Sequence, residues 1–262
     1  MVNNEPVSGI DETVKKGEPG TFWHIFLEPT RCFEGLNIKP RWLIPLILSM
    51  VIAFTTGLVI SNRVDMEQAV RKQIASSQAA SQLTEEQIDQ QVQMSAKIGK
   101  VSTLVAPVVI TPLFMVLIAG LIMLGVFVLG SEVNGQDYQG EGVESRSAFS
   151  RVFAITVSSM FFYNVVGGIL AITVLLIASD PNSLNLQNLV STNPAFLVDA
   201  TESKVLYSFL SHLDILVWYT LFLIGLGISK ISQKCSVAKG VMIIGFWYVL
   251  YSLAHTGVAA LF

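Results

Sequence analysis

Five long apolar stretches limit what this chain can fold into more than any other feature of the sequence. They run over Leu43 to Ser61, Val101 to Ser131, Val152 to Ser179, Val205 to Ser229 and Gly240 to Phe262. A helix needs about 20 apolar residues to cross a hydrocarbon core roughly 30 Å thick. The sequence therefore predicts an all-α integral membrane protein with five transmembrane helices, at about 43–61, 101–131, 152–179, 205–229 and 240–262.

The composition agrees with this fold class. Hydrophobic residues make up 52% of the chain and charged residues 13%, whereas a soluble domain carries roughly 25% charged residues. These values exclude a soluble enzyme, a nucleic-acid-binding protein and a disulfide-stapled secreted domain. The two cysteines, Cys32 and Cys235, have no neighbours at metal-ligand spacing, so we expect no disulfide, no metal site and no cofactor.

The basic residues predict the orientation. Ten of the 16 Lys and Arg residues lie in the N-terminal region, in the loop after the second span or in the turn after the fourth. With five spans, these three segments share one side of the membrane. Because Lys and Arg are enriched in cytoplasmic segments, we expect an inner-membrane protein with a cytoplasmic N-terminus and an external C-terminus.

Two short segments precede the membrane domain, which we assign to residues 42–262. Residues 1–20 are polar and show no apolar period, a pattern typical of a disordered tail, here cytoplasmic. Residues 21–41 combine aromatic side chains such as Trp23 with basic ones such as Arg31. This combination predicts an amphipathic segment that lies in the membrane interface.

The segment between the first two spans shows a helical pattern. Met66, Val70 and Ile74 recur every four residues, which places them on one face of a helix. Thr84 and Gln87 have the spacing of a capping box at the start of a second helix. The sequence therefore predicts an extramembrane helical hairpin between the first and second spans.

Three polar residues inside the predicted spans are candidates for a buried polar site: Asp214, His255 and Asn164. A carboxylate at the centre of a membrane helix costs roughly 2.5 to 3.5 kcal/mol to insert, and it should face protein or water. Asp214 and His255 lie at similar depth on antiparallel neighbours, so we expect them to meet, whereas His212 points to the opposite side. Either Asp214 forms a structural hydrogen bond inside the bundle, or these residues bind an ion, a proton or a small ligand.

Three segments carry separate patterns. FLEPTRCFEGLNIKPRWLIPLIL (Phe26 to Leu48) combines prolines with Phe and Trp, LTEEQIDQQVQM (Leu83 to Met94) is the polar start of a helix, and LDILVWYTLFLIGLGISKIS (Leu213 to Ser232) has Asp, then Trp, then Gly-x-Gly. Besides Asp214, the patterns rest on Pro29, Phe33, Pro40, Trp42, Pro45, Trp218, Gly225 and Lys230. In these segments the chain resembles the Yip (Ypt-interacting protein) domain family of polytopic membrane proteins, in its prokaryotic branch.

The resemblance implies five membrane helices and a cytosolic N-terminus. Eukaryotic members of the family are associated with Rab-type GTPases, but this chain lacks the Asp-Leu-x-Gly-Pro motif that they carry before the first span, so GTPase binding is not expected. HExxH, GxSxG and CxxC motifs are also absent, which argues against an enzyme.

We therefore expect a non-enzymatic membrane scaffold or partner-binding protein. Its expected partners are the lipid bilayer and other membrane proteins or a second copy of itself, and not nucleic acid. The alternative is a transporter or channel component that uses the buried Asp/His site.

Overall fold

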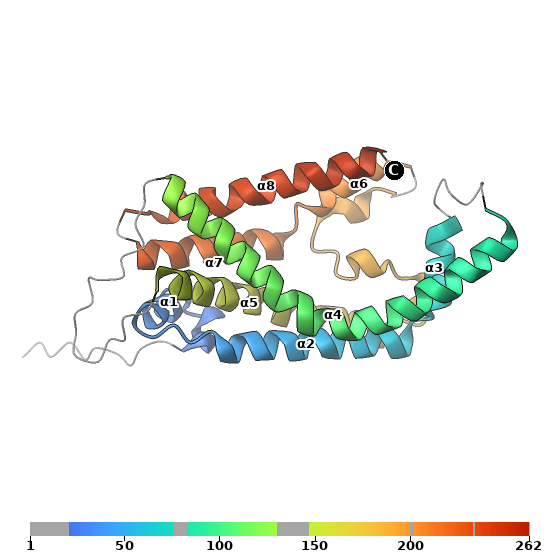
Figure 1. Ribbon diagram of the computed structural model, residues 1–262, viewed down its shortest axis with the longest axis horizontal. Coiled ribbons are helices and arrows are strands. Elements are labelled where there is room, and N and C mark those ends of the chain that lie inside the picture. The colour runs from blue at the N-terminus through green and yellow to red at the C-terminus, as the bar shows by residue number, and fades with distance from the viewer. Residues whose placement is uncertain (1–20, 76–82, 130–146, 200–201, 233, 262) are drawn as a thin grey trace, which may run out of the picture.

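The computed structural model describes residues 21–75, 83–129, 147–199, 202–232 and 234–261, and all regular structure in these ranges is helical (Figure 1). In chain order, with η for a short 3-10 helix, the elements are η1 (Phe22–Ile25), α1 (Pro29–Ile38), α2 (Leu43–Arg63), α3 (Met66–Ala75), α4 (Glu85–Val128), α5 (Ala148–Ile177), η3 (Pro181–Ser183), η4 (Leu186–Asn188), η5 (Pro194–Leu197), α6 (Lys204–Ser211), α7 (Ile215–Ile231) and α8 (Val237–Leu261). The predicted all-α class is confirmed for these ranges, while the predicted tail, residues 1–20, lies outside them.

Four helices are long and apolar enough to cross a membrane by themselves: α2, α4, α5 and α8. They correspond to the first, second, third and fifth apolar stretches of the sequence. The fourth stretch forms α6 and α7, which reach the necessary length only together and are bent by 41° at the break between them. The described part of the chain is thus helical, with four membrane-length helices, or five if the bent pair crosses as one broken span.

The break between α6 and α7 replaces the uninterrupted helix that the sequence predicts over residues 205–229. Asp214 accepts hydrogen bonds from the backbone N–H groups of Leu216 at 2.8 Å and Val217 at 3.1 Å. The first N–H groups of a helix have no partner within the helix, and a side-chain carboxylate at the N-cap satisfies them. Asp214 therefore starts a new helix, α7, instead of lying inside an old one.

A single helix of 44 residues, α4, contains residues 101–128 of the second apolar stretch. At about 1.5 Å per residue it is roughly 66 Å long, about twice the thickness of a hydrocarbon core. The predicted capping box is confirmed at its start. The Thr84 hydroxyl accepts from the Gln87 N–H at 3.3 Å, and the Gln87 side-chain oxygen accepts from the Thr84 N–H at 2.9 Å.

The core of the bundle lies around α5, which contacts α2, α4 and α7. Every residue from 151 to 159 of this helix is buried. The segment predicted to lie in the membrane interface packs onto the same core, because Ile25, Cys32 and Phe33 are all 0% exposed and α1 contacts α5 and α7. These three apolar side chains are therefore covered by protein, whereas Trp23 and Leu27 of the same segment are 57% and 89% exposed.

The helices α7 and α8 approach each other at two glycines. A Cβ atom on Gly240 would lie 2.5 Å from the carbonyl oxygen of Gly225, and one on Gly225 would lie 2.6 Å from the backbone nitrogen of Val241. Non-bonded atoms do not come this close, so neither position has room for a side chain. Small residues allow such close backbone packing between membrane helices, and here they set the separation of α7 and α8.

Arg63, the last residue of α2, links this helix to the end of α5. Its guanidinium group donates hydrogen bonds to the carbonyl oxygens of Leu175, Leu176 and Ala178 at 3.1 to 3.4 Å. The last carbonyl groups of a helix have no partner within the helix, and the helix dipole favours a cation at this end. Arg63 therefore caps α5 from a neighbouring helix.

Replacing Arg63 by Ala should lower the free energy of unfolding by about 1 kcal/mol, because the last carbonyl groups of α5 lose a charged donor. Arg71→Ala is a matched control, since Arg71 forms an exposed ion pair with Asp89; its effect should be much smaller. Thermal unfolding in detergent measures both. Equal losses in the two variants would contradict the capping role of Arg63.

Candidate functional site

Polar side chains gather where α6 ends and α7 begins. His212 is the C-cap of α6 and Asp214 is the N-cap of α7, and both are buried, with 8% and 9% of their surface exposed. Buried polar groups are almost always hydrogen-bonded. The hydrogen-bond partners of Asp214 and His212 form two groups. One group joins the segment between α5 and α6 to the start of α7, and the other joins α6 to α8.

The first group surrounds the carboxylate of Asp214. One carboxylate oxygen caps α7, and the other accepts a hydrogen bond from the Thr192 hydroxyl. The backbone carbonyl of Thr192 in turn accepts a hydrogen bond from the N–H of Ile215 at 3.2 Å. The segment around Thr192 is thus held to the first turn of α7, and both oxygens of the buried carboxylate have partners.

The second group surrounds Ser208 on α6. The Ser208 hydroxyl lies 3.1 Å from Nδ1 of His255, and the Ser208 carbonyl oxygen lies 2.6 Å from Nδ1 of His212. The two imidazole rings have centroids 5.0 Å apart. The Tyr248 hydroxyl donates to the carbonyl oxygen of His212 at 2.8 Å, so this group ties α6 to α8.

The three predicted site residues occupy different environments. Asp214 is bonded to Thr192 and to the start of α7, whereas His255 is bonded to Ser208. The direct contact expected between Asp214 and His255 is thus not among their hydrogen bonds, since the break turns Asp214 toward its own helix start. Asn164 is half-buried on α5, and no hydrogen bond joins it to either residue in the described part of the chain. His212, the weaker candidate by spacing, lies beside His255.

Sequence reasoning missed the residues between α5 and α6 that complete this region. Besides Thr192, a network of side-chain amides lies there: Asn188 and Asn193 bond each other at 3.1 and 3.5 Å, and Asn185 donates to the Tyr207 hydroxyl at 2.9 Å. The signal for it was the density of Asn between two apolar stretches. Amides in such a loop bond readily to one another and to nearby backbone.

The N-terminal positions of the family pattern build the end of the bundle near α1. Pro29 is the first residue of α1, where its missing N–H costs nothing. Phe33, Pro40 and Pro45 are buried, and the Trp42 ring packs edge-on against Phe153 with centroids 5.3 Å apart. These residues make structural contacts, which fix the entry of the chain into α2.

The remaining pattern positions lie on α7. Gly225 makes the close contact with α8, and the Trp218 ring lies 5.9 Å from that of Tyr248. The Lys230 ammonium group is 2.9 Å from the Glu34 carboxylate of α1. All three therefore connect α7 to its neighbours.

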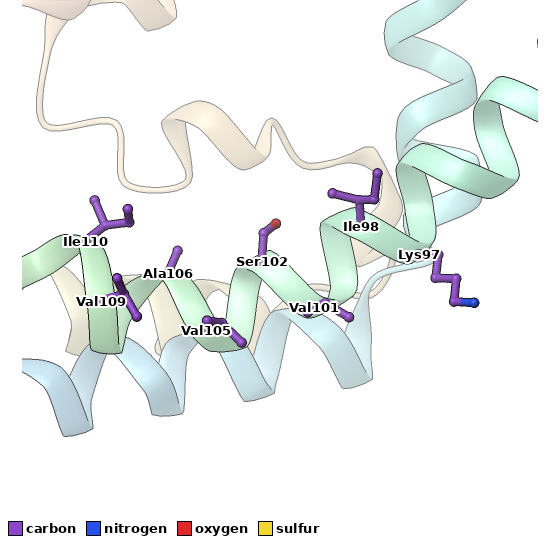
Figure 2. Close-up of a pocket in the computed structure, with 8 residues that line it drawn as sticks. All are labelled: Lys97, Ile98, Val101, Ser102, Val105, Ala106, Val109 and Ile110. Carbon is purple, nitrogen blue, oxygen red and sulfur yellow. The ribbon is translucent and has the colours of Figure 1, made fainter.

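An apolar groove of about 510 Å³ follows one face of α4 (Figure 2). The residues that line it are Lys97, Ile98, Val101, Ser102, Val105, Ala106, Val109 and Ile110. The Ser102 hydroxyl donates to the Gly99 carbonyl oxygen at 3.0 Å, and Lys97 is the one titratable residue of the lining. From Val101 on, this lining suits contact with hydrocarbon, and the polar residues around Asp214 and Ser208 are the stronger candidate site.

The thiol of Cys32 is a further nucleophile, and burial in α1 raises its pKa to about 12. Only the thiolate reacts with alkylating agents, so in a Cys235→Ser background Cys32 should resist alkylation at pH 8 until the protein is denatured. Mass spectrometry follows the alkylation, and rapid labelling of the folded protein would contradict this prediction.

The same pKa difference makes stability depend on pH. The thiol ionises near pH 8.5 in the unfolded chain but only near pH 12 in the folded protein. The free energy of unfolding should therefore fall as pH rises from about 8.5 toward 12.

Within the ranges that the structure describes, no group of three or more His, Cys, Asp or Glu side chains is arranged to hold a metal ion. No family model, curated protein or solved structure matches the chain.

Proposed function

We propose that this chain is a Yip-type protein of the cell's inner membrane that acts as a non-enzymatic scaffold for a protein partner. The observation that supports the proposal is a helical arm, defined as α3 together with residues 85–100 of α4. In Figure 1 this arm extends beyond the ends of the other helices. Because α4 is roughly 66 Å long and a hydrocarbon core is about 30 Å thick, part of α4 must lie outside the bilayer.

Contacts between its two helices give the arm a fixed shape. Val92 and Ala96 of α4 are 2% and 3% exposed, and they lie in the part of α4 that packs against α3. An ion pair between Arg71 and Asp89 joins the two helices across their outer surface. A polar helical pair held by one continuous helix presents a rigid surface to a partner outside the membrane.

The proposal includes five spans, with α6 and α7 crossing as one broken unit, and a cytoplasmic N-terminus. This topology places the arm on the external side. Glu67→Cys in α3 and Thr30→Cys in α1 test it, because both positions are exposed. In a background without Cys32 and Cys235, a membrane-impermeant maleimide should label Glu67→Cys in intact cells and Thr30→Cys only after disruption of the membrane. The reverse pattern would contradict the orientation.

Site-specific photo-crosslinking tests the scaffold function. A photoreactive amino acid at Gln90, which is exposed on the arm, should form a discrete adduct with a protein in intact cells. The matched control is Leu117, which is 58% exposed in the apolar part of α4 and should form adducts with lipid. If Gln90 and Gln93 both give no protein adduct, the scaffold proposal fails.

One observation favours the second candidate function, a transporter or channel component. The buried Asp214 lies at a break between two half-helices, and such broken helices form ion and substrate sites in many transporters. In reconstituted vesicles a transporter should show an ion flux that Asp214→Asn abolishes, whereas a scaffold should show no flux in either form.

A further inference from the structure

We propose that α4 forms a parallel coiled-coil contact with α4 of a second copy of this chain. The contact runs along an apolar stripe on the surface of α4, which consists of Met94, Ile98, Val101, Val105 and Val108. The inference does not depend on the scaffold function proposed for the arm, because two copies of a transporter can pair in the same way. The spacing of the stripe, its position and the charges around it support the proposal.

The spacing of the stripe is that of a coiled-coil seam. Its residues follow one another in alternating steps of four and three residues, and each is between 46% and 67% exposed. Two helices wind around each other when apolar residues recur every 3.5 residues on average. In the polar part of α4, the positions on both sides of the stripe are polar: Gln90, Ser95, Lys97 and Ser102. The stripe is narrow there, as expected of a seam between two helices.

The opposite face of α4 is occupied by the protein itself. Val92 and Ala96 are buried in the part of α4 that packs against α3. Further along, a Cβ atom on Gly57 of α2 would meet the backbone carbonyl of Thr103. The stripe therefore faces away from α2 and α3, and the groove in Figure 2 runs along this outward face.

The outer end of the stripe lies where lipid tails do not cover it. Lys97 and Lys100 are exposed on either side of Ile98 in the sequence, and Lys side chains keep their charge at or outside the membrane interface. Met94, about one turn further from the apolar part of α4, is 67% exposed. A run of exposed apolar side chains outside the hydrocarbon core marks a contact with another protein, so the stripe is expected to bind a helix.

A second copy of the chain is the partner that the stripe fits. Copies of one membrane protein insert with the same orientation, so their α4 helices are parallel and each stripe residue meets its counterpart. Among the charged residues of the described segment 85–100, Lys97 alone occupies a position that flanks the stripe. In a parallel pair this position lies opposite Ser102 of the second copy. No like charges then face each other across the contact, so nothing in the stripe repels its own copy.

The membrane compensates for the short length of the stripe. It covers about two heptads, fewer than a coiled coil in solution usually has. The bilayer already holds both helices in a common orientation, so part of the translational and rotational freedom that association costs is lost beforehand. A short contact is therefore expected to hold the pair together in a membrane.

Disulfide formation in native membranes tests the contact, in single-cysteine variants of a background without the natural cysteines. Met94→Cys and Ile98→Cys should each form at least about five times as much disulfide-linked dimer as Gln93→Cys, because a disulfide needs Cβ atoms about 3.5 to 4.5 Å apart. Gln93 is the matched control, since it is exposed on α4 but lies off the stripe. Equal yields at the three positions, or no dimer from Met94→Cys and Ile98→Cys, would overturn the inference.

The number of chains in native-lipid nanodiscs gives an independent answer, measured by photobleaching of a fluorescent fusion. The wild type should bleach in two steps. Ile98→Glu places like charges opposite each other and should weaken the pairing by at least about tenfold, whereas Gln93→Glu adds the same charge off the stripe and should leave it unchanged. If Ile98→Glu fails to fold, the wild type still decides, because a single bleaching step would overturn the pairing. An adduct between Gln90 and an unrelated protein, without any disulfide-linked dimer, would overturn this inference and support the scaffold proposal.

Discussion

Adding one methyl group at Gly240 should lower the free energy of unfolding by about 3 kcal/mol, near the upper end of what overpacking costs. In Gly240→Ala the new Cβ would lie 2.5 Å from the Gly225 carbonyl oxygen and 2.8 Å from its Cα. Both are backbone atoms that cannot rotate away, so α7 and α8 must separate. This separation loosens packing along the whole of the pair. Gly225→Ala should have a similar effect, because its Cβ would meet Val241.

Gly245→Ala on the same helix is the matched control. A Cβ at this position has nothing within 4 Å, so the substitution should leave stability unchanged or raise it by about 0.5 to 1 kcal/mol through the higher helix propensity of Ala. Unfolding by SDS in mixed micelles, followed by circular dichroism, measures both variants. Similar midpoints for Gly240→Ala and Gly245→Ala would show that α7 and α8 are not in backbone contact.

A helix was predictable from the sequence wherever an uncharged apolar stretch is long enough to cross a bilayer. α2 and α5 coincide with uncharged stretches long enough for a bilayer, because a chain in hydrocarbon must satisfy its backbone groups within a helix. The second helix of the predicted hairpin kept its helical period into the second span, where Pro107 and Pro112 predicted a kink or tilt. The hairpin helix and the span form one helix, α4, because no terminating residue follows the Thr84 cap, and Pro107 and Pro112 lie inside the helix without ending it.

The candidate site was predictable only in part. The cost of a buried carboxylate identified Asp214. Asp before an apolar run is also a helix-start signal, but the apolar length of residues 205–229 favoured one continuous span. The break depends on Thr192, which is 22 residues away in the chain. The predicted contact between Asp214 and His255 assumed that one continuous helix runs through Asp214. On such a helix His212 would point away from His255, whereas the two rings in fact lie side by side.

Asp214→Ala should lower the free energy of unfolding by about 3 kcal/mol. The substitution removes the N-cap of α7 and leaves the N–H groups of Leu216 and Val217 and the hydroxyl of Thr192 without their acceptor. Loss of the cap costs about 1 kcal/mol, and leaving the Thr192 hydroxyl without its acceptor costs roughly a further 1 to 3 kcal/mol. Thermal unfolding in detergent measures the change.

Asp214→Asn is the matched conservative variant. Its side-chain oxygen still caps α7, because Asn and Asp are about equally good N-caps, so the loss should be about 1 kcal/mol. If Asp214→Asn is as unstable as Asp214→Ala, the negative charge itself holds the site together. If both variants are as stable as the wild type, the carboxylate does not cap α7.

Double-mutant cycles then identify the partner of Asp214. Asp214→Ala combined with Thr192→Val should show a coupling of about 1 kcal/mol, because the two side chains share a hydrogen bond. Asp214→Ala combined with His255→Gln should be nearly additive, with a coupling below about 0.5 kcal/mol, since His255 is bonded to Ser208 instead. A large coupling to His255 and none to Thr192 would mean that the carboxylate faces α8 in the folded protein, and a shared proton or cation site would then explain both residues better than a helix cap.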